Sequence, residues 1–122
     1  NKPRVVQALL DRGASPNIAD SDGWTTLTVA SLEGHLHVVR ALIAGGARVN
    51  ARDADGNTAL MTASFKGHDA VVEALLAAGA NAALADKQGR VAADWAHEGA
   101  REHSSTASRQ RFKQILDAIA IS

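Results

Sequence analysis

Residues 20–52 read DSDGWTTLTVASLEGHLHVVRALIAGGARVNAR, and residues 53–85 read DADGNTALMTASFKGHDAVVEALLAAGANAALA. The two stretches align without a gap and share an Asp-x-Asp-Gly opening, a central Gly-His pair, a Val-Val doublet and a Gly-Ala exit. Asp86 and Gly89 continue the opening after another 33 residues. A fixed period of this kind indicates a repeat protein, in which stacked units bury a core that one unit cannot bury alone.

A single unit predicts two short helices and a projecting turn. Thr25 is a suitable N-cap for a first helix over residues 26–31, and Gly34 accepts the left-handed backbone of a helix C-terminus. From residue 35 to about residue 44, apolar residues recur at i, i+1, i+4 and i+5, which predicts a second helix that Gly46 ends. The other residues of the unit are rich in Asn, Asp and Gly and predict a hairpin or turn. We therefore expect an all-α solenoid of stacked helix pairs.

The two ends of the chain depart from the regular unit. Residues 1–19 match only the second helix and exit of a unit, with Val5, Val6, Leu9 and Leu10 on the apolar stripe. This half repeat and the absence of a starting Met predict a fragment of a longer protein. Residues 86–122 begin as a unit, but Ile115 lies 40 residues after Leu75 instead of 33.

The delay in this last unit coincides with a polar stretch over residues 101–110, which is expected to be a solvated loop containing Ser104, Ser105, Thr106 and Ser108. The later face of Phe112, Ile115, Leu116 and Ile119 predicts a capping helix. One domain over residues 1–122 is thus expected, with a half repeat (1–19), two repeats (20–52 and 53–85) and an irregular C-terminal capping repeat (86–122).

The unit resembles the ankyrin repeat, which is also about 33 residues long. That family's unit opens Asp-x-x-Gly-x-Thr-Pro-Leu-His, places Gly-His between its helices and continues Val-Val-x-x-Leu-Leu and Gly-Ala-x-x-Asn. This chain has DSDGWTTLTVA, Gly34-His35, VVRALI and GARVN, then DADGNTALMTA, Gly67-His68, VVEALL and GANAA. The Pro-Leu-His signature is replaced in every unit, and Ala83 stands where Asn17 and Asn50 stand in theirs. These departures predict the loss of some hydrogen bonds between neighbouring hairpins.

The resemblance implies a non-catalytic protein–protein interaction module that binds its partner through the hairpin tips and the concave face of the first helices. Carried over to this sequence, the partner-binding surface holds Ser21, Asp22, Trp24, Leu32, Glu33, Arg52, Ala54, Asp55, Asn57, Phe65, Lys66, Lys87, Gln88 and Arg90. Trp24, Leu32 and Phe65 are expected to form its centre, since Leu32 and Phe65 lie one repeat apart and aromatic residues are only 3% of the chain. The alternative is that Leu32 and Phe65 only fill the helix–hairpin junction. Trp95 is expected to lie against the insert or the cap.

A second class of function is a regulatory or scaffolding segment of a larger enzyme, which a catalytic domain upstream in the parent reading frame would support. An enzyme active by itself is not expected. His35 and His68 occupy the same place in two units, which favours a structural role at the helix junction, and His35-x-His37 lacks a third metal ligand. His97-Glu98 is followed by Arg101 where a zincin motif needs His. No catalytic residue, metal or cofactor is therefore predicted.

Charge and composition limit the classes of partner that the chain is expected to bind. Thirteen Lys and Arg balance thirteen Asp and Glu, so the chain lacks the basic excess that nucleic-acid binding normally needs. No stretch is apolar enough to predict a transmembrane helix. The expected partner is another protein or another domain of the parent chain, with no nucleic acid and no membrane. The chain has no cysteine, so disulfide chemistry cannot indicate its cellular compartment. We favour the cytoplasm over the periplasm.

Overall fold

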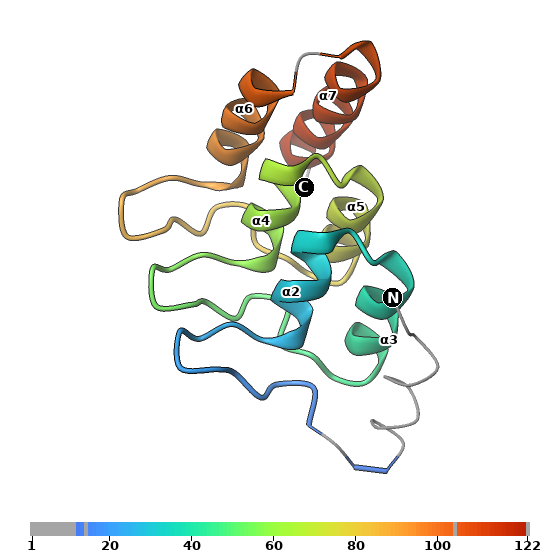
Figure 1. The fold of residues 1–122 in the computed structure, drawn as a ribbon, viewed down its shortest axis with the longest axis vertical. Helices are drawn as coiled ribbons and strands as arrows, with labels where there is room; N and C mark the ends of the chain where they lie inside the picture. The colour runs from blue at the N-terminus through green and yellow to red at the C-terminus, as the bar shows by residue number, and fades with distance from the viewer. Residues whose placement is uncertain (1–11, 14, 104, 122) are drawn as a thin grey trace.

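The computed structural model describes residues 12–13, 15–103 and 105–121, and these form stacked pairs of antiparallel helices with loops that project to one side (Figure 1). The pairs are α2 (Thr26–Glu33) with α3 (Leu36–Ala44), α4 (Ala59–Lys66) with α5 (Asp69–Ala77), and α6 (Ala92–Glu102) with α7 (Thr106–Ala120). No strand occurs in these residues, where the β-type pairing is one isolated bridge between Ala19 and Thr25. The predicted all-α solenoid of stacked helix pairs is confirmed.

The first helix of each regular unit begins and ends where the sequence predicts. The Thr25 hydroxyl accepts a 3.2 Å hydrogen bond from the Thr28 N–H, and Gly34 ends α2 with a left-handed φ of 74°. Thr58 and Gly67 do the same for α4. At α6 no hydroxyl is present at the N-cap, and the Asp94 carboxylate instead accepts a 3.0 Å bond from the Val91 N–H. A side-chain acceptor at the N-terminus of a helix satisfies one of its free backbone donors.

The core lies between the two layers of helices. The helices α2, α4 and α6 lie side by side in the inner layer, while α3, α5 and α7 form the outer layer (Figure 1). The apolar stripes of the outer helices face inward, since Val39, Val72 and Leu75 are fully buried against the inner layer. Burial of these aliphatic side chains is the main source of stability in a chain with so few aromatic residues.

The C-terminal helix caps the stack as its apolar face predicts. Phe112 and Ile115 are buried, and Leu116 and Ile119 pack partly buried against the core. The expectation of a solvated loop over residues 101–110 is wrong for most of that stretch, because α6 continues to Glu102 and α7 already begins at Thr106. The Ser105 hydroxyl caps α7 by accepting a 3.2 Å bond from the Ser108 N–H, and Ser108 itself is buried. Ser104 lies outside the described residues.

Asparagine side chains join the exits of neighbouring units. Asn17 donates from Nδ2 to the Gly46 carbonyl at 3.2 Å and accepts the Arg48 N–H at 2.7 Å. Asn50 makes the same two bonds to Gly79 and Asn81. Ala83 has no side chain that could continue this pattern. The predicted helix of the half repeat, with Val5, Val6, Leu9 and Leu10, lies outside the described residues.

Candidate protein-binding surface

The three hairpin tips are built in the same way. In the first, one Asp20 carboxylate oxygen accepts the N–H groups of Asp22 and Trp24, both at 2.9 Å. Asp53 and Asp86 accept from the residues two and four positions further along in their own tips. The aspartate therefore holds the turn from inside, while the side chains between and after it are free to vary.

Neighbouring tips are hydrogen bonded into a row. The Ala54 N–H donates to the Asp22 carbonyl at 2.9 Å, and the Lys87 N–H donates to the Asp55 carbonyl at 3.0 Å. This contact explains the glycines of the first two tips: a Cβ on Gly23 would lie 2.9 Å from the Asp53 Cα, closer than side-chain atoms approach. Gly23 also has a φ of 83°, which residues with a Cβ rarely adopt. The tips thus form one continuous edge of the molecule.

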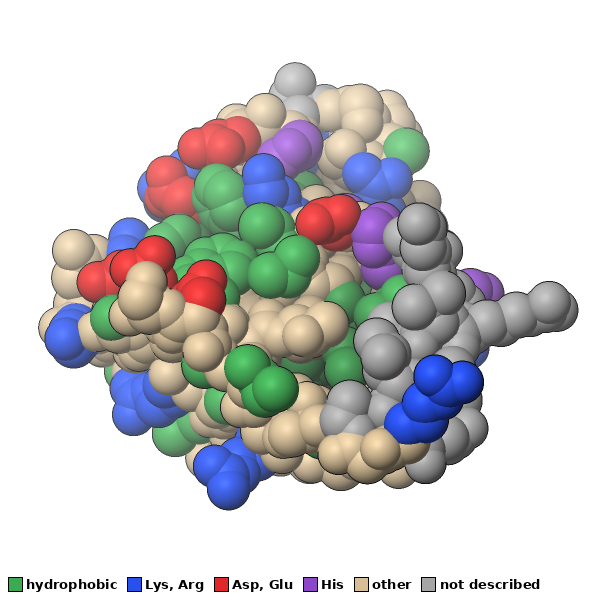
Figure 2. All heavy atoms as spheres, turned by 60° about the horizontal axis from the view of Figure 1, so that its bottom comes forward, with side chains coloured by type: hydrophobic (Ala, Val, Ile, Leu, Met, Phe, Trp, Pro, Cys, Tyr) green, Lys and Arg blue, Asp and Glu red, His purple; other side chains and the backbone are tan. Residues whose placement is uncertain are grey.

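Beside this edge, the inner helices present an apolar surface. A hollow of about 60 Å³ opens there, lined by Leu32, Asn57, Met61, Thr62, Phe65 and Trp95. Its walls come from all three units, because α2 supplies Leu32, α4 supplies Phe65 and α6 supplies Trp95. Nearby, Val29 is 41% exposed, a large fraction for an aliphatic residue of a helix. Figure 2 shows hydrophobic side chains gathered on the face seen there, with acidic and basic side chains around them.

Aromatic and cationic groups organise one side of the hollow. The rings of Phe65 and Trp95 meet edge to face, with centroids 5.5 Å apart and an angle of 84° between their planes. The Arg90 guanidinium stacks on the other side, 4.1 Å from the centre of the Trp95 ring. The Lys66 ammonium lies 5.8 Å from the centre of the Phe65 ring. Such stacked groups are held in place before a partner arrives, which lowers the entropic cost of binding.

One sequence expectation needs correction at this point. Trp95 was expected against the insert or the cap, but it contacts Phe65 and Arg90 on the inner face. Phe65 is partly buried and meets Trp95 there. The sequence holds a signal for this arrangement, since Trp95 follows Thr62 by 33 residues and Thr62 lies one helical turn before Phe65 on the same side of α4.

Two polar atoms in this region have no hydrogen-bond partner. The Asn57 Oδ1 and the Trp95 Nε1 are buried, and neither is bonded to any residue that the structure describes. Both residues line the apolar hollow and also a neighbouring polar depression between the second and third tips. An unsatisfied buried polar group costs roughly 1–3 kcal/mol, so a partner that bonds to either atom would recover part of this free energy.

The position of Arg90 depends on a buried carboxylate. Its Nε donates to Asp86 Oδ2 at 3.0 Å, and the Asp86 side chain is only 2% exposed. Burial acts to raise the pKa of Asp86, but hydrogen bonds from the backbone of Arg90 and Gln88, together with the Arg90 guanidinium, hold the pKa below its ordinary value. Asp86 therefore remains charged at neutral pH and fixes the guanidinium over Trp95.

The structure separates the sequence-predicted surface residues into groups. Leu32, Asn57 and Phe65 line the apolar hollow, and Asp55, Asn57, Lys87, Gln88 and Arg90 line the polar depression beside it. Ser21, Asp22 and Ala54 are exposed at the tips, Glu33 lies 3.7 Å from His35, and Lys66 lies beside Phe65.

Two of the predicted residues lie apart from these groups. Trp24 is half-buried and is not part of the lining of the hollow, so the structure does not bring it together with Leu32 and Phe65 there. Arg52 is exposed, but its side chain donates to the carbonyls of Gly56 and Ala85 and so joins two hairpins. Val29 and Trp95 belong to the inner face although the sequence-predicted surface did not include them.

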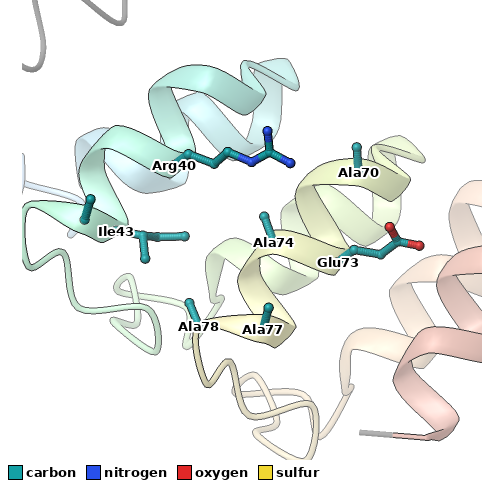
Figure 3. A pocket seen from close by; sticks show the side chains of 8 residues that line it. Arg40, Ile43, Ala70, Glu73, Ala74, Ala77 and Ala78 are labelled. Carbon is teal, nitrogen blue, oxygen red and sulfur yellow. The ribbon is translucent and has the colours of Figure 1, made fainter.

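A larger depression lies on the opposite layer, between α3 and α5 (Figure 3). It measures about 520 Å³ and is lined mainly by the methyl groups of Ala44, Ala70, Ala74, Ala77 and Ala78. Arg40 reaches over it toward α5, whereas Glu73 points away from Arg40 (Figure 3). Size alone does not make a binding site, and this groove lacks the aromatic anchors and convergent polar groups found on the inner face.

The histidines were predicted to have structural roles, and His68 has one. Its Nε2 lies 2.9 Å from the carbonyl oxygen of Leu32, so the ring connects the second unit to the end of α2. Within the described ranges no group of three His, Asp or Glu side chains could hold a metal ion. None of the described helices is long and apolar enough to cross a membrane.

Comparison with known proteins agrees with this architecture. The sequence model of ankyrin repeats (three copies) matches residues 1–86, and no curated protein matches the chain. Ankyrin repeats generally act as protein–protein interaction modules, and domains built from them are typically non-catalytic. The period, the helix pairs, the projecting hairpins and the matched residues lead to one conclusion: the chain belongs to the ankyrin-repeat family.

Proposed function

We propose that this chain is a non-catalytic protein-binding module whose partner lies on the hairpin tips and the concave face of the inner helices. The observation that favours this site is the apolar hollow formed by Leu32, Phe65 and Trp95 beside a row of exposed polar tips. An apolar centre with a polar rim is the usual anatomy of a protein interface. In this proposal residues 1–122 act as one domain, with units 1–19, 20–52, 53–85 and 86–122.

The hollow and the tips have complementary roles in the proposal. Side chains that fill a hollow exclude water and supply most of the binding free energy, whereas exposed charges mainly affect the association rate and the choice of partner. Trp24 is placed at the tip edge, where it is half-buried and takes part in no described aromatic contact. Its ring can therefore add to an interface without first leaving the core.

The test uses the partner captured from the source cell and titrated against variants of this chain. Truncation of an aromatic anchor commonly costs about 2 kcal/mol or more, so Trp24→Ala and Phe65→Ala are each expected to weaken binding roughly thirtyfold. Trp24→Ala is expected to leave the melting temperature nearly unchanged. Phe65→Ala also loses the contact with Trp95, so its titration is made well below its own melting temperature.

The matched control is Glu73→Gln, an exposed change on the outer layer. It is expected to change neither affinity nor stability. If both aromatic variants bind as tightly as the original chain, the concave face is not the binding site and the proposal is wrong.

A further inference from the structure

The charges around the concave surface change sign along the solenoid. Residues 20–34 contain Asp20, Asp22 and Glu33 but no Lys or Arg. The last hairpin tip, in contrast, contains Lys87 and Arg90 with a single carboxylate, Asp86. The N-terminal end of the surface is therefore negative, and its C-terminal end is not.

One carboxylate in each of the first two tips is available to a partner. Asp22 and Asp55 are exposed, and neither carboxylate is paired with any described residue. Asp20 and Asp53 instead accept N–H groups within their own tips. At the other end of the row, Lys87 is exposed and unpaired among the described side chains.

The shape of the hollow limits what can fill it. Its volume of about 60 Å³ is far below the roughly 300–1,000 Å³ of typical small-molecule pockets. Its walls are the side chains of Leu32, Met61 and Phe65 with the edge of Trp95. Its small size and mainly apolar lining favour a single aliphatic side chain as the occupant, over a small-molecule ligand or a larger aromatic ring.

We propose that the partner is a protein segment in extended conformation that places one aliphatic side chain in the hollow and a Lys or Arg against the tips of Asp22 and Asp55. This inference rests on the proposed function and specifies the chemistry of its partner. Adjacent units are about 10 Å apart, the spacing of packed helices, and an extended chain advances about 3.3 Å per residue. The cation is therefore expected about three to six residues from the aliphatic side chain.

A random twelve-residue peptide library displayed on phage and selected on the whole chain tests this chemistry. The expected consensus contains one Leu, Ile, Val or Met with a Lys or Arg three to six residues to one side. Two variants check where such peptides bind. Thr62→Trp fills the hollow with a residue that Trp95 already provides at the same place in the next unit, and it is expected to reduce affinity at least about tenfold.

The second variant, Asp22→Asn with Asp55→Asn, keeps the shape of the tips and removes two charges. It is expected to bind the selected peptides about threefold to tenfold more weakly at low salt and to flatten the salt dependence of the affinity. The matched control, Glu73→Gln with Asp117→Asn, removes the same charge from exposed positions on the outer helices and is expected to have no such effect.

Three outcomes would overturn the inference: selected peptides without a cation, undiminished binding to Thr62→Trp, or no peptide enriched on the original chain over Thr62→Trp. None of these results decides the proposed function, which depends on titration of the natural partner against Trp24→Ala and Phe65→Ala. Failure of that titration would overturn both.

Discussion

The middle junction and the last junction of the solenoid are built from different interactions. Between residues 20–52 and residues 53–85, polar side chains bridge the units: His68 reaches the carbonyl of Leu32, and Asn50 bonds to Gly79 and Asn81. Between residues 53–85 and residues 86–122 these bridges are gone, because Ala83 replaces the asparagine and Arg101 stands where the histidine would recur.

Apolar packing takes over at the last junction. The Phe112 ring lies against Gly67, and Gly99 brings α6 so close to α4 that a Cβ would lie 2.1 Å from the Phe65 carbonyl oxygen. The tip hydrogen bond is kept at both junctions. The comparison teaches that a unit joined on both sides uses directional polar bonds, while the terminal unit is held by buried rings and close helix contact.

The largest effect is expected where the cap depends on one ring. Phe112→Ala removes a fully buried aromatic side chain and should lower the free energy of unfolding by about 3–5 kcal/mol. Leu42→Ala, a buried change in the regular part, is the reference and should cost about 2–5 kcal/mol. Urea denaturation measures both. A Phe112 variant that loses less than about 1 kcal/mol would show that the cap adds little, contrary to the comparison.

A smaller loss is expected from Gly99→Ala. Alanine favours helix over glycine by about 1 kcal/mol, but the new Cβ would collide with backbone, and overpacking of this kind costs about 1–3 kcal/mol. The net expectation is a lower melting temperature. Gly45→Ala is the matched control, because Ala78 occupies the same place in the next unit with nearly the same φ and ψ. Stabilisation by both changes would mean that α6 and α4 do not approach as closely as described.

The hydrogen bonds of Asn50, which join the two regular units, should contribute less to the free energy of unfolding. Asn50→Ala removes two exposed hydrogen bonds and is expected to destabilise the chain by about 1 kcal/mol. The reverse change, Ala83→Asn, should have little effect on thermal melting, since no regular exit follows it. A stabilising Ala83→Asn would show that the last junction can still accept the polar bridge.

A loss similar to that of Asn50→Ala is expected from Asp86→Asn at neutral pH, about 1 kcal/mol, which is the difference between a hydrogen bond to a charged and to a neutral acceptor. The folded-state pKa of Asp86 is lowered, so its contribution is present above the unfolded-state pKa and is lost as the pH falls through the folded-state pKa.

The melting temperature of the original chain should therefore fall more steeply than that of the variant as the pH drops below about 4, near the unfolded-state pKa of aspartate. Parallel pH curves for the original chain and Asp86→Asn would contradict the assignment of Asp86 as a charged support for Arg90.

The regular units, residues 20–85, could be predicted from the sequence, and the irregular C-terminal unit, residues 86–122, could be predicted only in part. The spacing of Gly34 and Gly67, the Thr caps and the Val-Val doublets determine the helix pairs, because each residue acts within its own unit. The face of Phe112 and Ile115 was also sufficient to predict the capping helix. The lengths of α6 and α7 could not be predicted in this way, because a polar stretch is as typical of helix ends as of a loop. The structure shows that α7 begins directly after Ser105, whose hydroxyl caps it.

The binding surface was harder to predict for a related reason. Tip positions follow from the hairpins, but the hollow depends on contacts between different units, such as the meeting of Phe65 with Trp95. A period shows which residues occupy equivalent places, but it does not show that a large side chain in one unit covers its neighbour in the next. Arg52 illustrates the same limit, since its exposed place suggested partner binding while its guanidinium joins two hairpins.

Because an aspartate fixes the backbone of each tip from inside, the three hairpins share one backbone shape that does not depend on their outward side chains. Asp20, Asp53 and Asp86 fix the same backbone around different neighbours, so the outward side chains can be exchanged between units without rebuilding the turn. A graft of Lys87-Gln88 onto positions 21 and 22 would replace Asp22 and add a lysine beside Asp20, which neutralises the negative first tip and keeps its hydrogen bonds. Substitutions at the outward positions can therefore change which partner the chain binds without changing the shape of the loop.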